Sequence, residues 1–176
     1  VAAVYREAGN LGAPGPAGDA ARGAAGLRIG AISNAENESY GIELGYSYAH
    51  SEVICADPGA DIPSNPLHYI PTTAPGVRMP SVLLNGGEPI FDRLGLCLTL
   101  ACFGTRPSDA LVAAAAQRGV PLAVLPVDDP AIVGVYGRGM LLVRPDQHIA
   151  WRGSACDDRN AANAIVSRVL GFGPSG

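Results

Sequence analysis

An apolar run, LCLTLACF, occupies Leu96–Phe103 in the C-terminal half of the sequence. Its residues are almost all apolar, which is typical of a β-strand that is buried on both faces of a sheet. The next stretch, TRPSDALVAAAAQRG, has the start and stop signals of a helix, with Thr105 or Ser108 as the N-cap and Gly119 at its end. A second apolar run, VPLAVLPVD from Val120, predicts another strand, so that a strand, a helix and a strand follow one another.

The rest of the C-terminal half completes a sheet. LLVRPDQHIAWR, Leu141–Arg152, has two apolar runs around a Pro-Asp turn and predicts a β-hairpin. DDRNAANAIVSRVLGFG predicts an amphipathic helix that is capped by Asp157 or Asp158 and ends at Gly171. This order of elements is the connectivity of a thioredoxin-like sheet, whose strand-helix-strand unit is parallel and right-handed. The predicted fold class is therefore α/β, a thioredoxin-like mixed sheet with flanking helices.

The N-terminal residues differ from this half in composition. VAAVYREA, Val1–Ala8, predicts the end of a helix. Residues 9–26, GNLGAPGPAGDAARGAAG, are rich in Gly, Ala and Pro and cannot bury enough apolar surface to order themselves. We therefore expect a helix end and a flexible linker over residues 1–26, and the folded domain over residues 27–173.

Three further features are expected before the central strand. Tyr40–Ile54 has β-formers in partial alternation and predicts one or two strands. Cys55–Gly76 contains five prolines, which favours an extended and irregular segment. Ser81–Gly95 predicts a short strand, a Gly-Gly turn and one or two helical turns.

Composition limits the possible functions. The chain has 176 residues, of which 48% are hydrophobic, and suits one domain. It has no Lys, no basic run and a net charge of −4, so we expect no nucleic-acid partner. No apolar stretch is long enough to span a bilayer, so we expect no membrane association either. Because the chain begins at Val1 rather than Met, we expect that it was processed or cut from a larger protein.

The cysteine pattern argues against redox and metal chemistry. The four cysteines form no C-x-x-C and lie near no His at metal-ligand spacing: they are Cys55, Cys97, Cys102 and Cys156. A dithiol oxidoreductase would carry C-x-x-C at the start of the helix after the first strand, where this sequence has FGTRPSDA. We expect reduced, buried thiols in a cytoplasmic protein.

The hairpin contains the strongest candidate for catalysis. Arg144, Asp146, His148 and Arg152 lie close in sequence and could form a general acid–base cluster. Turn chemistry explains the same residues, because Pro145 suits the first corner of a tight turn and an Asp at the next position bonds to its own backbone. We favour the structural interpretation.

The other polar residues do not suggest a site. His50 and His68 have no partner that the sequence identifies, and their role, like that of the histidine in the hairpin, stays open. Glu36, Glu38 and Glu43 are interpreted as a solvated face. The Gly-rich segment matches neither phosphate-binding motif. We therefore predict no catalytic, cofactor-binding or metal-binding residue in this chain.

Four motifs in a fixed order carry a family resemblance. GIELGYSY, YIPTTAPGVRMPSVLL, EPIFDRLG and LLVRPDQHIAWRG extend from about Tyr40 to Gly153. Together they resemble the C-terminal region of the FAD-dependent aromatic hydroxylases, the class A flavoprotein monooxygenases, which include phenol, hydroxybenzoate and polyketide hydroxylases. The matching residues are Gly76, Arg78 and Pro80 in G-x-R-x-P, Asp92, Leu94 and Gly95 in the following turn, and Arg144, Pro145, Asp146, Ala150, Trp151 and Arg152 in the hairpin.

Two residues depart from the family pattern. Ser81 stands where many members have His, and Gln147 stands where Gly is usual. The second change removes a residue that adopts a left-handed conformation easily, so we expect an altered turn.

The resemblance implies a function for a longer parent enzyme. Such an enzyme uses NAD(P)H to reduce FAD and then uses oxygen to hydroxylate an aromatic ring of a phenolic or polyketide substrate. The family's flavin-binding motifs are not found in this sequence. We therefore expect an accessory domain, inactive alone, that partners the FAD- and substrate-binding domain of the parent. The substrate is not specified, because the family's specificity lies in the other domains.

Two alternatives stay open beside this hypothesis. The chain could be a free-standing thioredoxin-like binding or dimerisation module without redox activity, and a homodimer is then one possible assembly. Size-exclusion chromatography with and without a flavin domain distinguishes the hypotheses.

Overall fold

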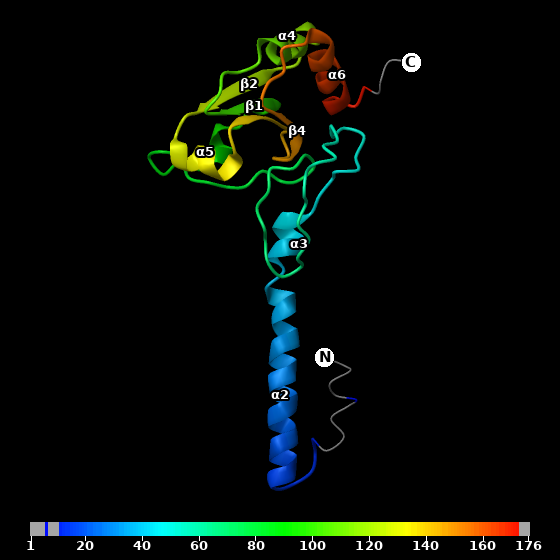
Figure 1. Cartoon of the computed structure of the whole chain (residues 1–176). Coiled ribbons are helices and arrows are strands. Elements are labelled where there is room, and N and C mark those ends of the chain that lie inside the picture. Colours follow the sequence, from blue (N-terminus) through cyan, green and yellow to red (C-terminus); the bar gives the residue numbers. More distant parts are fainter. Residues whose placement is uncertain (1–5, 7–10, 173–176) are drawn as a thin grey trace.

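A computed structural model describes residue 6 and residues 11–172 of the chain (Figure 1). The helices and strands, in chain order, are α2 (Pro16–Asn37), α3 (Tyr40–Gly45), the 3-10 helix η1 (Ile90–Arg93), β1 (Leu98–Phe103), α4 (Asp109–Gln117), β2 (Leu122–Val127), α5 (Pro130–Tyr136), β3 (Gly139–Val143), β4 (Ile149–Gly153) and α6 (Arg159–Val169).

Within residues 11–172 the strands form one four-stranded mixed sheet in the order β2-β1-β3-β4. β1 pairs in parallel with β2 and antiparallel with β3, and β3 pairs antiparallel with β4. Leu100 of β1 lies between Val124 of β2 and Leu142 of β3. Every residue of β1 is buried, as its apolar run predicts. This connectivity confirms the predicted thioredoxin-like mixed sheet.

Helices cover both faces of the sheet (Figure 1). Successive residues of β1 point to opposite faces. Leu100 packs with Leu111 of α4 and Val166 of α6 on one face. Phe103 packs with Ile132 of α5 on the other face, where η1 also contributes to the core. The sheet is therefore buried on both sides, which accounts for its apolar strands.

The Pro-rich segment covers the outer edge of β4. The backbone N–H of Cys55 donates to the carbonyl of Ala150 (2.8 Å), and that of Gly76 donates to the carbonyl of Ile149 (2.7 Å). Residues 55–76 contain no helix or strand, which confirms the irregular conformation that the prolines predict. The segment nevertheless acts as a partner for the sheet.

Side-chain caps fix the starts of three helices. Ser108 accepts from the N–H of Leu111 (3.1 Å) at α4, and Asp158 caps α6 in the same way, so two predicted caps are confirmed. α5 was not predicted from the sequence. Its signal is Asp129, which accepts from the N–H of Ala131 (2.8 Å), followed by a proline at the first helical position.

The predicted linker conformation is wrong for part of residues 9–26. α2 begins at Pro16 and is a helix of 22 residues that runs through residue 27 without a break. Its alanines are strong helix formers, and an ion pair between Asp19 and Arg22 joins neighbouring positions of the first turns. The domain boundary at residue 27 stays a prediction. The helix end predicted for Val1–Ala8 lies outside the described residues except Arg6, which is helical.

The strands predicted for Tyr40–Ile54 are also wrong. Residues 40–45 form α3, and only Ser47 makes a β-bridge, to Val77. α3 packs directly on backbone, since a Cβ placed on Gly41 would lie 1.6 Å from the carbonyl oxygen of Asn65. This close tertiary contact overrides a β-propensity that depends strongly on context.

Residues 81–95 follow their prediction more closely. Gly86 and Gly87 have φ values of 97° and 82° and form the predicted turn, and η1 is the predicted helical turn. The predicted strand is reduced to a single bridge between Leu83 and Pro89.

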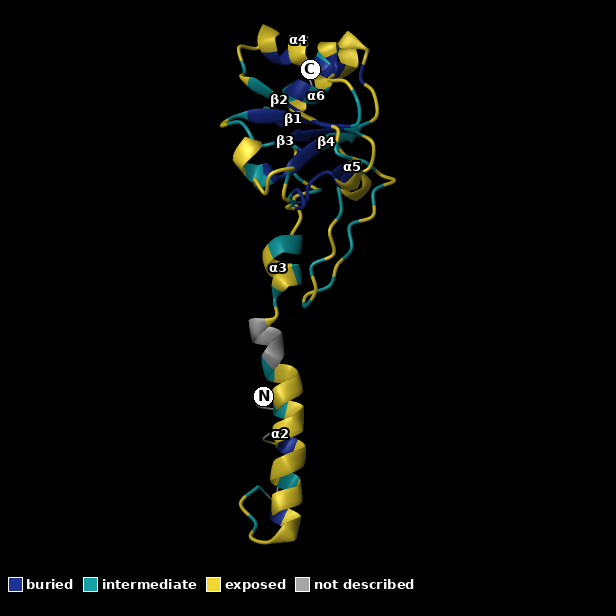
Figure 2. Ribbon diagram, turned by 90° about the vertical axis from the view of Figure 1, so that its left-hand side faces the viewer, coloured by how far each residue is buried: buried dark blue, intermediate teal, exposed yellow. Residues whose placement is uncertain are grey.

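α2 stands apart from the sheet. It projects away from the compact part of the molecule, and most of its residues are exposed (Figure 2). Across the part of the chain that the structure describes, no helix combines the length and apolar character that crossing a membrane requires.

Candidate functional site

The turn between β3 and β4 brings three of the four hairpin side chains together. Arg144 Nε donates to Asp146 Oδ2 (3.1 Å), and Asp146 Oδ1 accepts from the backbone N–H of His148 (3.1 Å). His148 Nδ1 donates to the carbonyl of Asp146 (2.9 Å), since a carbonyl can only accept. These are the short-range contacts of an Asx-type turn. They support the structural interpretation, and the absence of a catalytic residue from the hairpin stays a prediction.

His148 is enclosed rather than presented to a ligand. It is 1% exposed, and its Nε2 has no hydrogen-bond partner among the described residues. The rings of Tyr46 and Tyr48 lie 5.1 and 4.8 Å from the imidazole. A general base must reach the proton that it takes. In this conformation His148 therefore has no access to a substrate.

Gln147 keeps the left-handed turn conformation in spite of its side chain. Its φ is 68°, and among the described residues it alone is a non-glycine with a positive φ. Arg78 Nε donates to Gln147 Oε1 (2.9 Å), and the Arg78 guanidinium lies 4.6 Å from the ring centre of Phe91. These contacts hold the side chain in place, so the expected alteration of the turn is not seen.

Arg152 makes its contacts elsewhere. Its Nε donates to Asp57 Oδ2 (2.6 Å) and its Nη1 to Thr73 Oγ1 (3.4 Å). The hydrogen bond from Arg152 is the main cause that lowers the pKa of Asp57. Asp57 and Arg152 are 95 positions apart, so no local pattern could have predicted this pair.

A cavity of about 280 Å³ lies beside this ion pair. It is at the end of the sheet, where β1 ends at Phe103 and β3 begins at Gly139. The stacked rings of Phe103 and Tyr136, 4.2 Å apart, form part of its wall, and Arg138 and Arg152 supply positive charge. The sequence did not predict this cavity, because Arg138 follows α5, a helix that was itself not predicted.

The residues at the start of α4 are not arranged as a reactive thiol or as a phosphate-binding site. Ser108 Oγ accepts from the N–H of Leu111 and donates to the carbonyl of Cys156, so the cap is used within the chain. The four cysteines are free, and burial raises the pKa of the Cys102 and Cys156 thiols, the reverse of what a reactive thiolate needs. The turn before α4 has one glycine, Gly104, and lacks the G-x-G-x-x-G pattern that lets a backbone approach a dinucleotide. These residues do not fit FAD.

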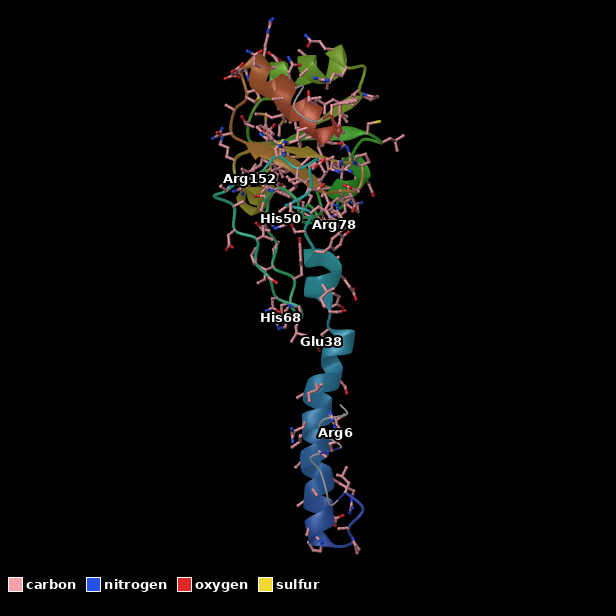
Figure 3. All side chains as sticks on the ribbon, turned by 90° about the vertical axis from the view of Figure 1, so that its right-hand side faces the viewer. Arg6, Glu38, His50, His68, Arg78 and Arg152 are labelled. Carbon is pink, nitrogen blue, oxygen red and sulfur yellow. The ribbon has the colours of Figure 1, made fainter. Side chains whose placement is uncertain are left out.

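The remaining histidines are not among the residues that line the cavity. His50 and His68 are exposed, and Figure 3 shows His68 at the tip of the Pro-rich segment, far from Arg152. Among the residues that the structure describes, no group of three or more His, Cys, Asp or Glu side chains is arranged to hold a metal ion.

The chain is similar to proteins that are several times longer. It is 30% identical over 146 residues to the FAD-dependent monooxygenase opdD of Penicillium oxalicum, a match that covers 79% of this chain and 28% of that protein. The chain thus spans less than a third of the curated relatives it matches most clearly.

Solved structures show the same relation. A structure of native and K252c-bound RebC-10x has a TM-score of 0.79 and 30% identity, covering 93% of this chain and 31% of that one. The flavin-dependent monooxygenase PieE, in complex with FAD and substrate, has a TM-score of 0.69 and 29% identity, covering 96% of this chain and 32% of that one. The family described as aromatic-ring hydroxylase, C-terminal, matches residues 72–172, which is more than half of the chain. The chain therefore belongs to the family of aromatic-ring hydroxylase C-terminal domains.

Proposed function

We propose that the chain is the accessory C-terminal domain of a flavin-dependent aromatic-ring monooxygenase and that it acts by packing against the flavin- and substrate-binding domains of that enzyme. The parent reaction would be the NAD(P)H- and O2-dependent hydroxylation of a phenolic or polyketide substrate. The free cysteines are consistent with a cytoplasmic location.

The observation that carries this proposal is the exposure of α2. A helix gains most of its stability in a protein from packing one face against other elements. α2 contacts little of the sheet domain, and its apolar residues Leu27 and Ile32 are 81% and 44% exposed. A partner that covers α2 would supply the missing packing.

The glycines of α2 identify the face that we expect to be covered. Gly23, Gly26 and Gly30 follow i, i+3 and i+7 and so lie on one side of the helix. Each helical glycine costs about 1 kcal/mol relative to Ala. A Cβ placed on any of the three would meet nothing within 4 Å, so no described contact within the chain accounts for them. Close approach of a partner's backbone would do so.

The test compares the chain alone with the chain joined to the flavin domain. We expect the purified chain to show no flavin absorbance and no NADPH oxidation, and we expect it to form a complex with the flavin and substrate domains of its own parent enzyme in size-exclusion chromatography. Gly26→Leu should weaken this complex, because it places a bulky side chain in the contact. Arg118→Gln, on the sheet domain, is the control and should bind as the unchanged chain does.

Other results would contradict the proposal. Flavin bound to this chain alone would show that it carries its own cofactor site. A stable homodimer that does not bind the flavin domain would favour the alternative hypothesis of a free-standing dimerisation module. We also propose that residues 27–173 hold the fold, so a chain that begins at Leu27 should keep the cooperative urea transition of the full chain.

A further inference from the structure

The cavity at the end of the sheet has the composition of a binding site for an anion. Arg138 and Arg152 contribute two positive charges and Asp57 one negative charge, which leaves a net charge of +1 in a chain whose net charge is −4. The Asp57 carboxylate is already bonded to Arg152, so it adds little repulsion toward a second anion. The cavity is therefore positively charged, although the net charge of the whole chain is negative.

Both arginines keep hydrogen-bond donors for a ligand. A guanidinium has five N–H donors. The contacts of Arg152 use Nε and Nη1, and its Nη2 has no bond to any residue that the structure describes. Arg138 is exposed and makes no hydrogen bond or ion pair with the described residues. Two planar guanidinium groups can thus bind one carboxylate, with bidentate geometry at either of them.

The rest of the wall combines polar groups, such as Thr73 and Ser154, with the edges of packed apolar side chains. Phe103 and Met140 are fully or almost fully buried and line the cavity, and the ring of Tyr136 stacks on Phe103 with 19° between the ring planes. The hydroxyl of Tyr136 donates to the carbonyl of Pro80, which fixes the ring. These packed side chains hold the wall behind the two arginines in a fixed position.

Size and position agree with a small ligand. A cavity of about 280 Å³ has room for a small ligand that carries one carboxylate. The cavity also lies outside the carboxyl end of β1, and ligands of open α/β sheets commonly bind at that end of parallel strands.

We propose that this cavity is a binding site for a small carboxylate, with Arg138 and Arg152 bound to the carboxylate group. The residues named for this site all belong to this chain. It can be tested on this chain alone, whether or not the proposed function holds.

The test is a titration of the full chain with benzoate, followed by NMR chemical shifts, with the neutral isostere benzamide as the matched ligand. We expect saturable binding of benzoate, and about tenfold weaker binding of benzamide, because it loses the charge-assisted hydrogen bonds. Arg138→Gln should weaken benzoate binding by about tenfold. Arg22→Gln makes the same change of charge on α2, outside the cavity, and should leave benzoate binding unchanged.

Asp57→Asn gives a second, opposite test. Loss of its negative charge raises the net charge of the cavity from +1 to +2, so benzoate should bind more tightly. The proposal is wrong if benzoate shows no saturable binding, if benzamide binds equally well, or if Arg138→Gln has no effect. It is also wrong if added flavin domain displaces benzoate, since the cavity would then receive a side chain of that domain.

Discussion

Replacing Ser108 by Ala should destabilise the domain far more than the loss of an ordinary helix cap. Its hydroxyl accepts from the N–H of Leu111 at the start of α4 and donates to the carbonyl of Cys156 before α6, and it is 4% exposed. Loss of an N-cap costs about 1 kcal/mol. A buried carbonyl left without a donor costs a further 1–3 kcal/mol or so. The expected loss in the free energy of unfolding is therefore about 2–4 kcal/mol.

Urea unfolding followed by circular dichroism measures this loss. With an m-value near 2 kcal/mol/M, the midpoint should fall by roughly 1–2 M. Asp129→Ala is the matched control, because Asp129 caps α5 from a partly exposed position and, among the described residues, its side chain bonds only to the N–H of Ala131. Its cost should stay near about 1 kcal/mol, and Ser108→Thr should lose little. Equal costs for Ser108→Ala and Asp129→Ala would contradict this prediction, since the bond to Cys156 would then contribute nothing to the free energy of unfolding.

Two further predictions concern two glycine turns and the ion pair between Asp57 and Arg152. Gly76 has a φ of 97°, and a Cβ there would lie 2.4 Å from the backbone nitrogen of Ala49, so Gly76→Ala should lower the free energy of unfolding by about 3 kcal/mol or more. Gly86 has the same φ but meets nothing within 4 Å, so Gly86→Ala should cost only about 1 kcal/mol; similar costs in urea titrations would contradict the clash. The pKa of Asp57 is lowered in the folded state, so its pair with Arg152 stabilises the fold above the unfolded pKa of Asp, and this contribution is lost as the pH falls through the lower folded value. Between pH 6 and pH 3 the unchanged chain should therefore lose more thermal stability than Asp57→Asn, and parallel curves would count against the pair.

The sequence predicted the C-terminal half of the fold well because its signals are local. The apolar run of β1, the Ser108 cap, the Pro-Asp turn and the periodicity of α6 each lie within a few residues. They give the connectivity of the sheet without any knowledge of long-range contacts.

The sequence failed where distant residues decide the conformation. α3 replaces a predicted strand because Gly41 packs against the backbone near Asn65. The cavity depends on Asp57 meeting Arg152 across 95 positions, and on Arg138, which follows a helix of only seven residues. The hydrophobic periodicity of the sequence does not indicate such long-range contacts. The exposed glycines of α2 are a third feature that the sequence alone does not explain. No described contact within this chain requires a glycine at these positions.

The Pro-rich cover on β4 also limits how the protein can aggregate. An open sheet edge invites strands of other molecules to add to it and to extend the sheet from one molecule to the next. With β4 already bonded to Cys55 and Gly76, the other outer strand, β2, is the remaining edge, and it carries Pro126, which has no N–H to donate. Removal of the irregular segment would uncover a row of free backbone groups, and the domain would then be prone to form fibrils through β4.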